Sequence, residues 1–201
     1  MKSKLLAIIF FLMTTSFLSF IAKYQIDQCY ITFNSATGLL MDGSERIPKN
    51  SENTRKLKTE NGEVEVTRID GYQVLYYNEK SVPFVTLKGE LSKKNAYDGD
   101  QKKVLDNLTY LNAQSPGMET KGLMELEFNG YKIYGLSRGT IESGNTLGSF
   151  VMFPGEGVTI YFNFNNAKPT DRSFQTVDDY KKQRNRFLEE YTNYLKGSLN
   201  K

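Results

Sequence analysis

Two acidic side chains near the middle of the chain have the spacing that carboxylate chemistry needs. Glu125 and Glu127 alternate with Met124, Leu126 and Phe128. In an extended strand, residues two apart share one face and lie roughly 7 Å apart, a separation at which two carboxylates can cleave a glycosidic bond. The same alternation is typical of a strand with one solvated face. We therefore interpret the pair as surface and keep a glycan-acting carboxylate hydrolase as the alternative.

Oxygen ligands suited to calcium gather at Asp98-Gly99-Asp100, with Asn95 close by. The full loop of alternating ligands that ends in a glutamate is missing from the sequence. Asp100 also stands before an amphipathic stretch, where its carboxylate could accept hydrogen bonds from the first N–H groups of a helix. We expect a helix cap here and no metal site.

The segment Gly135–Gly148 is rich in glycine and polar residues, which predicts a loop. It matches neither of the glycine patterns that bind phosphate. Arg138 within it could still hold an anionic group through two parallel hydrogen bonds, unless it pairs with Glu142 or stays in water. If a ligand pocket exists, we predict that Tyr134 and Arg138 line it.

The residues that the chain lacks exclude several classes of enzyme. It has no histidine and a single cysteine. This excludes Ser-His-Asp and Cys-His nucleophiles, as well as ordinary structural zinc sites, histidine-ligated haem and iron–sulfur clusters. We therefore predict no catalytic residues and no cofactor, and favour a non-catalytic protein. An enzyme that uses carboxylates or a Tyr/Lys pair is the alternative.

The charge balance argues against a nucleic-acid partner. The net charge is +3, from 26 basic and 23 acidic residues. Loss of Lys2 and Lys4 with a leader would reduce it to about +1. A nucleic-acid-binding domain is expected to carry a strongly basic face. We predict a protein partner or a small ligand instead.

The first residues predict export. Lys2 and Lys4 precede an uncharged, largely apolar run over residues 5–22, the arrangement of a signal sequence. Ala22 suits a cleavage site, but the run is also just long enough to span a membrane. Residues 1–22 are therefore a signal peptide or an uncleaved signal anchor. The protein would be periplasmic or extracellular, and would contact the membrane only through this segment if it is retained.

The region after the leader is expected to form one domain over residues 23–201. We predict that Cys29 opens a short buried strand, Cys29–Phe33. A lone cysteine cannot form an internal disulfide, so an apolar core must hold the fold. The stretch 44–58 is the most polar of the chain and predicts a long surface loop or joint.

Turn signals and alternating apolar residues predict a series of strands. Asp70-Gly71 and Asn129-Gly130 are dipeptides typical of tight hairpins. The expected strands cover residues 63–67, 72–77, 84–91, 124–128, 131–134, 149–153 and 158–164. Because tight hairpins join neighbouring strands, the sheet should be antiparallel.

Two helices are predicted from apolar stripes. Gln101–Gln114 carries one such stripe after Asp100. The second helix begins with a capping box at Thr176 and Asp179 and should stop at Gly197. The basic residues of this second helix, which we interpret as a solvated face, are Lys181, Lys182, Arg184 and Arg186.

The sequence therefore predicts an α+β protein. It should contain a single antiparallel sheet of about six or seven strands with two helices packed on it, one of them a C-terminal amphipathic helix. The functional prediction is an exported, non-catalytic binding or interaction module of the cell envelope or the secreted fraction. A His-independent enzyme and a membrane-anchored accessory subunit are the alternatives.

Overall fold

The computed structural model describes most of the chain from Asn53 onward. The described residues are 30, 33, 40–46, 53–78, 82–141, 146–166 and 173–199. The predicted leader and Cys29 lie outside them, so those predictions stay predictions. Within the described residues, no helix is long and apolar enough to cross a membrane.

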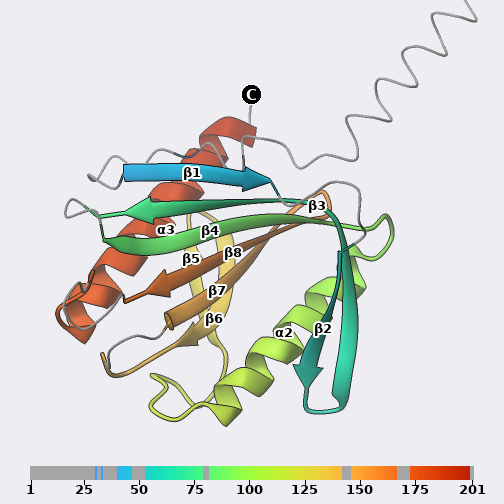
Figure 1. The fold of residues 1–201 in the computed structure, drawn as a ribbon, viewed down its shortest axis with the longest axis horizontal. Helices are drawn as coiled ribbons and strands as arrows, with labels where there is room; N and C mark the ends of the chain where they lie inside the picture. The colour runs from blue at the N-terminus through green and yellow to red at the C-terminus, as the bar shows by residue number, and fades with distance from the viewer. Residues whose placement is uncertain are drawn as a thin grey trace, which may run out of the picture.

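One antiparallel sheet with two helices packed on it forms the fold, which confirms the predicted α+β class (Figure 1). Seven strands follow the order β1-β3-β4-β8-β7-β6-β5, and β2 pairs with β3 beside this path. The strands are β1 (Leu40–Arg46), β2 (Asn53–Thr59), β3 (Gly62–Tyr77), β4 (Pro83–Ser92), β5 (Met124–Phe128), β6 (Tyr131–Ser137), β7 (Thr146–Gly155) and β8 (Val158–Asn165). The helices are α2 (Tyr97–Gln114) and α3 (Val177–Leu199).

The polar stretch 44–58 is not a loop throughout, contrary to the sequence prediction. Arg46 ends β1 opposite Tyr72, and Asn53 begins β2 opposite Arg68. The two strands therefore follow one another along the same edge of β3. An edge strand tolerates charged side chains, because one of its sides faces solvent and charges there discourage pairing with other chains. This explains why the stretch lacks an apolar pattern and yet forms strands.

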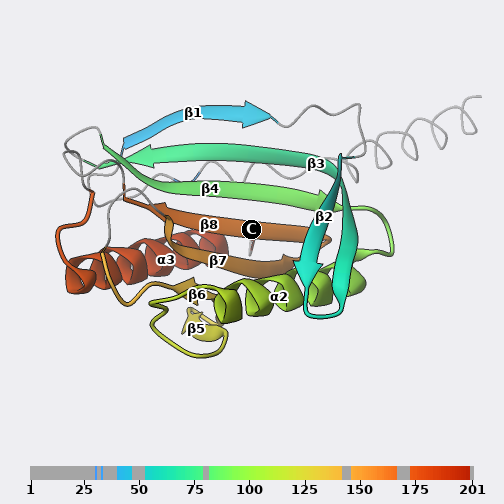
Figure 2. The same ribbon diagram turned by 60° about the horizontal axis from the view of Figure 1, so that its bottom comes forward.

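The predicted hairpin at Asp70-Gly71 is also wrong, because β3 continues through both residues. The pairing of β3 with β4 shifts register between Arg68 and Asp70, so the strand bends there instead of turning back. The real turn comes earlier, where Thr59 pairs with Gly62. The part of β3 before this bend pairs with β2, and the two strands reach past α2 (Figure 2). We call this two-stranded segment the arm.

The hairpin at Asn129-Gly130 is confirmed. It joins β5 to β6 with Phe128 opposite Tyr131. Asn129 has φ of 54° and Gly130 has φ of 87°, and positive values at both central residues are what a type I′ turn requires. The side-chain amide of Asn129 donates to the carbonyl of Glu189 at 3.1 Å and so ties the turn to α3.

The face of the sheet that α3 covers holds the main core. Alternate residues of the central strands point to this side, and the aromatic stripe of α3 packs on them. Phe187 lies at its centre, with its ring 5.1 Å from that of Tyr76 and 6.0 Å from that of Phe164. Tyr180 and Tyr191 are fully buried, so aromatic residues of this helix build the core.

Of the two predicted ends of α3, only the N-terminal one is correct. The Oγ1 atom of Thr176 accepts a hydrogen bond from the backbone N–H of Asp179 at 3.1 Å, which confirms the cap. At the other end the helix continues past Gly197 to Leu199.

The predicted strand at 29–33 is wrong for the two residues of it that the structure describes, since Tyr30 lies in a 3₁₀ turn and Phe33 lies outside any strand. Both are buried against α3, where Tyr191 donates to the carbonyl of Tyr30.

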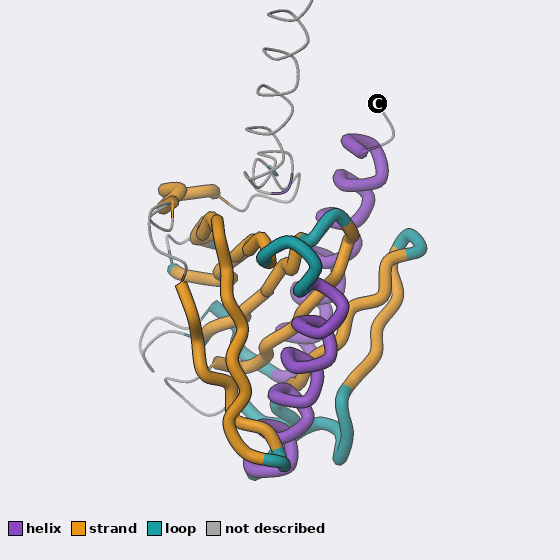
Figure 3. The backbone as a smooth tube through the Cα atoms, turned by 90° about the vertical axis from the view of Figure 1, so that its right-hand side faces the viewer, coloured by secondary structure: helices purple, strands orange, loops and turns teal. Residues whose placement is uncertain are grey.

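The opposite face carries a smaller apolar cluster under α2. Val104 and Leu108 of the helix pack on Leu136 of β6 and Val151 of β7. Figure 3 shows α2 between the arm on one side and the β5–β6 hairpin on the other. Leu111, which belongs to the same predicted stripe, remains 40% exposed. The apolar contact under α2 is therefore small, and polar groups complete this side.

Candidate functional site

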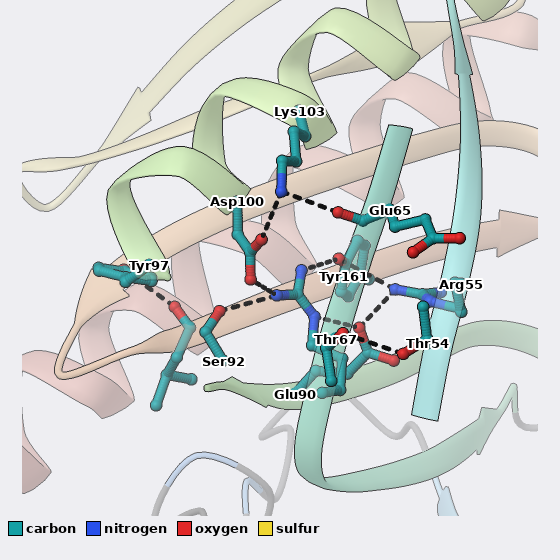
Figure 4. Close-up of polar contacts among 12 residues, drawn as sticks. Thr54, Arg55, Glu65, Thr67, Glu90, Ser92, Tyr97, Asp100, Lys103 and Tyr161 are labelled. Atoms are coloured by element: carbon teal, nitrogen blue, oxygen red, sulfur yellow. Dashed lines mark hydrogen bonds and ion pairs between the residues drawn. The ribbon is translucent and has the colours of Figure 1, made fainter. Parts of the chain in front are cut away.

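A group of charged residues lies between the sheet, α2 and the arm (Figure 4). Its members come from five elements and are Arg55 of β2, Arg68 of β3, Lys88, Glu90 and Ser92 of β4, Asp100 and Lys103 of α2, and Tyr161 of β8. We call this group the charged cluster. Strand pairing places several of them together, since Lys88 pairs with Tyr161 and Arg68 with Ser92.

Arg68 is the centre of the charged cluster and is only 3% exposed. Its Nη1 atom donates to Asp100 Oδ2 at 2.6 Å and to Ser92 Oγ at 2.7 Å. Its Nε atom donates to Glu90 Oε2 at 3.1 Å, and its Nη2 atom to the Tyr161 hydroxyl at 3.1 Å. Each nitrogen of the guanidinium group therefore has an acceptor, as a buried charge requires.

Glu90 accepts from three basic side chains although it is 1% exposed. Besides Arg68, Arg55 Nη2 lies 2.5 Å from its Oε2 atom and Lys88 Nζ lies 2.6 Å from its Oε1 atom. Burial works to raise the pKa of Glu90, but the charges of Arg55, Lys88 and Arg68 outweigh it and hold the pKa below its ordinary value. Glu90 is therefore an ionised carboxylate that is shielded from solvent.

Asp100 does not cap α2, which corrects the sequence prediction. The helix begins at Tyr97 and its N-cap is Ala96, so Asp100 lies inside the first turn. Its carboxylate points to the sheet, where Oδ2 accepts from Arg68 and Oδ1 lies 3.6 Å from Lys103 Nζ. Among the described residues, no group of Cys, Asp and Glu is arranged to hold a metal ion.

Tyr161 closes the charged cluster toward solvent together with Arg55. Its hydroxyl accepts from Arg55 Nη2 at 3.2 Å as well as from Arg68. The Arg55 guanidinium carbon lies 5.5 Å from the centre of the Tyr161 ring, a cation–π contact. Burial raises the pKa of Tyr161, and the neighbouring Glu90 carboxylate raises it further. The phenol therefore stays protonated at neutral pH.

The basic side chains of the charged cluster outnumber the acidic ones. Arg55, Arg68, Lys88 and Lys103 oppose Glu90 and Asp100 in the ion pairs of the cluster. The two carboxylates are buried, whereas the side chains of Arg55 and Lys88 are 33% and 20% exposed. The surplus positive charge therefore lies on the solvent side.

The sheet surface beside the charged cluster is polar and half open. Thr86 pairs with Asn163, which pairs with Ser149, and all three are half-buried. Gln73 is exposed and pairs with Lys88. We call Gln73, Thr86, Lys88, Ser149 and Asn163 the polar sheet face. Ser149 Oγ and Asn163 Oδ1 are hydrogen-bonded at 2.9 Å.

Of the two residues predicted to line a pocket, Tyr134 lies in the same cross-strand row as Tyr161 and Lys88. In this row Tyr134 of β6 pairs with Val151 of β7, Val151 pairs with Tyr161 of β8, and Tyr161 pairs with Lys88 of β4. Two strand spacings, about 10 Å, therefore separate Tyr134 from Tyr161. Tyr134 packs against the apolar cluster under α2.

Arg138 lies past the end of β6 and is engaged by the chain itself. It forms an isolated bridge with Met118, and its Nε atom donates to the carbonyl of Thr146 at 3.2 Å. The structure therefore does not bring Arg138 into the charged cluster. Ligand binding by Tyr134 and Arg138 stays a prediction.

The predicted loop Gly135–Gly148 is shorter than expected, because its two ends are strand. Gly135 belongs to β6 and Gly148 to β7. A Cβ atom at Gly148 would collide with the Tyr180 hydroxyl and lie 2.7 Å from the Phe150 ring. A Cβ atom at Gly135 would also collide with Phe150. These glycines therefore serve close packing under α3 rather than loop flexibility.

Arg184 is buried, which corrects its assignment to a solvated helix face. It is 3% exposed and lies between the Phe150 and Tyr180 rings, 5.3 and 5.4 Å from their centres. Its Nη1 atom donates to Ser137 Oγ at 3.1 Å and lies 3.5 Å from a carboxylate oxygen of Glu119. These contacts connect α3 to β6 and to the segment after α2.

The carboxylate pair that opened the sequence analysis lies on the surface. Glu125 and Glu127 are exposed on β5, and Glu125 forms an ion pair with Lys132 at 2.8 Å. This agrees with the interpretation as a solvated strand face. The carboxylates that the fold encloses include Glu90 and Asp100, and no pattern in the sequence identifies these two as a pair.

Comparison with known proteins gives no relative for this chain. No protein-family model matches it, no curated protein matches it, and no solved structure matches it. The function must therefore be argued from the geometry of the chain alone.

Proposed function

We propose that the protein is an exported, non-catalytic binding module whose binding surface is the polar sheet face together with the solvent side of the charged cluster. The apolar run after Lys2 and Lys4 supports export to the periplasm or the extracellular space. The observation that carries the binding role is the surplus of basic side chains beside the polar sheet face.

The arrangement of the buried groups supports binding over catalysis. A general acid or base must reach its substrate within hydrogen-bond distance. Glu90 and Asp100 are each 1% exposed and are already paired with Arg68. Catalysis would require these pairs to break and leave charges buried without partners, which costs several kcal/mol. A ligand at the surface needs no such change.

The surface itself has the composition of a recognition site. Hydroxyl and amide groups at Thr86, Ser149 and Asn163 can donate and accept hydrogen bonds, while Lys88 and Tyr161 lie in the next row of the sheet. Because the strands fix the backbone of all these residues, a ligand meets a prearranged surface. Prearrangement lowers the entropy that binding costs.

Native mass spectrometry of the chain purified from its own cells tests the binding role. A retained ligand should appear as added mass on the unaltered protein and disappear in Asn163→Trp, whose side chain fills the polar sheet face. Lys182→Trp is the matched control, because Lys182 is exposed on α3. An adduct that survives Asn163→Trp, or no adduct in any preparation, would contradict this surface.

The mass of the mature N-terminus tests the export part of the proposal. Cleavage near Ala22 would identify a released envelope or secreted protein. A full-length chain in the membrane fraction would favour the anchored accessory subunit. A full-length chain in the cytosol would overturn export altogether.

A further inference from the structure

The solvent-facing layer of the charged cluster presents cations and hides the carboxylates. The side chains of Arg55 and Lys88 are 33% and 20% exposed, whereas that of the Glu90 between them is 2% exposed. An anion that approaches from solvent therefore meets the guanidinium and ammonium groups before it meets the carboxylate. Arg68 and Asp100 lie behind this layer, whereas the side chain of Lys103, on the α2 side of the cluster, is 40% exposed.

The number of charges in the cluster favours a dianion. The ion pairs bring Arg55, Arg68, Lys88 and Lys103 against Glu90 and Asp100, which leaves a surplus of two positive charges. A phosphate monoester carries a charge of roughly −2 at neutral pH and has three strong acceptor oxygens. A carboxylate carries only one negative charge.

Hydrogen-bond donors are available for such a group. Arginine binds phosphate with its planar fork, and lysine acts as a point charge beside it. The Nε atom of Arg55 is buried and has no acceptor among the described residues. This N–H can reach a phosphate oxygen only if the Arg55 side chain, which is 33% exposed, rotates. The chain therefore leaves at least one strong donor unused at this place.

We propose that Arg55 and Lys88, with the Tyr161 hydroxyl beside Arg55, bind the dianionic phosphate group of a small phosphate monoester. The inference rests on the proposed function, because it names the ligand chemistry of that same surface. The remainder of the ligand would lie over the polar sheet face, where Thr86 and Asn163 can bind uncharged polar groups.

Isothermal titration calorimetry with methyl phosphate tests the charge of the ligand. The second ionisation of a phosphate monoester has a pKa of about 6, so the dianion fraction, and with it the affinity, should rise roughly tenfold between pH of about 5 and about 7. The chain has no histidine that would titrate in this range. Dimethyl phosphate, which cannot form a dianion, should bind at least fivefold more weakly at pH of about 7. Equal binding of the two compounds would overturn the inference and point to diesters such as lipid headgroups.

Variants test the position of the site. Arg55→Gln and Lys88→Gln should each weaken methyl phosphate binding about tenfold, the effect of one lost charge-assisted contact. Lys102→Gln, an exposed lysine on α2, should leave it unchanged. Thermal melting must show that each variant is folded at the temperature of the titration. Unchanged affinity in both folded variants would overturn the inference. A native adduct that still disappears in Asn163→Trp would then preserve the binding role with another ligand chemistry.

Discussion

The two faces of the sheet are packed by different kinds of contact. Under α3, aromatic rings such as those of Phe162, Phe187 and Tyr191 meet edge to face. Under α2 and the arm, Arg68 meets Glu90 and Asp100 through hydrogen bonds between charged groups. One side of the sheet therefore carries a large apolar core, and the other carries a small apolar cluster beside a buried ionic one.

This difference indicates that the two faces of the sheet have different roles. Apolar burial depends little on direction, and its contribution grows with the area removed from water. Buried ion pairs require a defined geometry and contribute little net stability, because desolvation offsets their attraction. We infer that the α3 face mainly stabilises the fold, whereas the α2 face mainly positions charges.

The largest effect is expected on the α3 face, from Phe187→Ala. The ring of Phe187 contacts those of Phe33, Tyr76 and Phe162, among others. Its removal should lower the free energy of unfolding by about 4–5 kcal/mol, the upper part of the range for such substitutions. Urea denaturation followed by circular dichroism measures the change. A loss below about 2 kcal/mol would show that this face is not the principal core.

Arg68→Met should lower the free energy of unfolding by about 3–4 kcal/mol, slightly less than Phe187→Ala does, because it leaves Glu90 and Asp100 buried with fewer partners. The decisive comparison is the triple variant with Glu90→Gln and Asp100→Asn. Removing all three charges should recover at least half of the loss, since no fully buried charge is then left without a partner. Arg55, Lys88 and Lys103 lose an acidic partner, but their side chains are 33%, 20% and 40% exposed and can be hydrated. If the triple variant were less stable than Arg68→Met in the same urea titration, the cluster would be a net source of stability.

The decrease in stability at low pH should come mainly from the charged cluster. We call the side of the sheet that holds this cluster, under α2 and the arm, the ionic face. Because the folded pKa of Glu90 is below its ordinary value, the ionised carboxylate contributes stability above the unfolded pKa of about 4.3. That contribution is lost as pH falls through the folded pKa. The stability difference between the unaltered chain and Glu90→Gln should therefore shrink as pH is lowered from about 6 to about 3. A difference that is constant with pH would contradict the ionised state of Glu90.

The smallest effect is expected for an ion pair outside both cores. Lys102 and Asp106 are 2.6 Å apart on α2, with side chains 77% and 42% exposed. Lys102→Gln should change the free energy of unfolding by less than about 0.5 kcal/mol, because exposed pairs are screened by water and salt. A change as large as that of Arg68→Met would show that exposure is a poor guide to ionic contributions in this protein.

The sequence predicts the α3 face well because its signals are local. The capping residue Thr176 and the hairpin Asn129-Gly130 act through backbone geometry within a few residues. The alternation of Val158, Ile160 and Phe162 along β8 identifies the buried side of the strand directly. In each case the pattern that predicts the element is also the pattern that the core uses.

The ionic face could not be predicted in the same way, because its partners are far apart in the sequence. Arg68 lies 22 residues from Glu90 and 32 from Asp100, so only the folded sheet brings them together. The available signal was an arginine and a glutamate inside strands, which is equally typical of a solvated strand face. Arg184 on α3 presents a similar ambiguity, because an arginine in an amphipathic helix is typical of its solvated face.

Mapping backbone amide shifts while methyl phosphate is added tests the division between the two faces most directly. We expect the shifted amides to lie in β2, β4 and β8, around Arg55, Lys88 and Tyr161, with the amides of α3 unchanged. Shifts centred on α3 or on the β5–β6 hairpin, or no shifts at a phosphate concentration that saturates the calorimetric signal, would contradict a binding role for the ionic face.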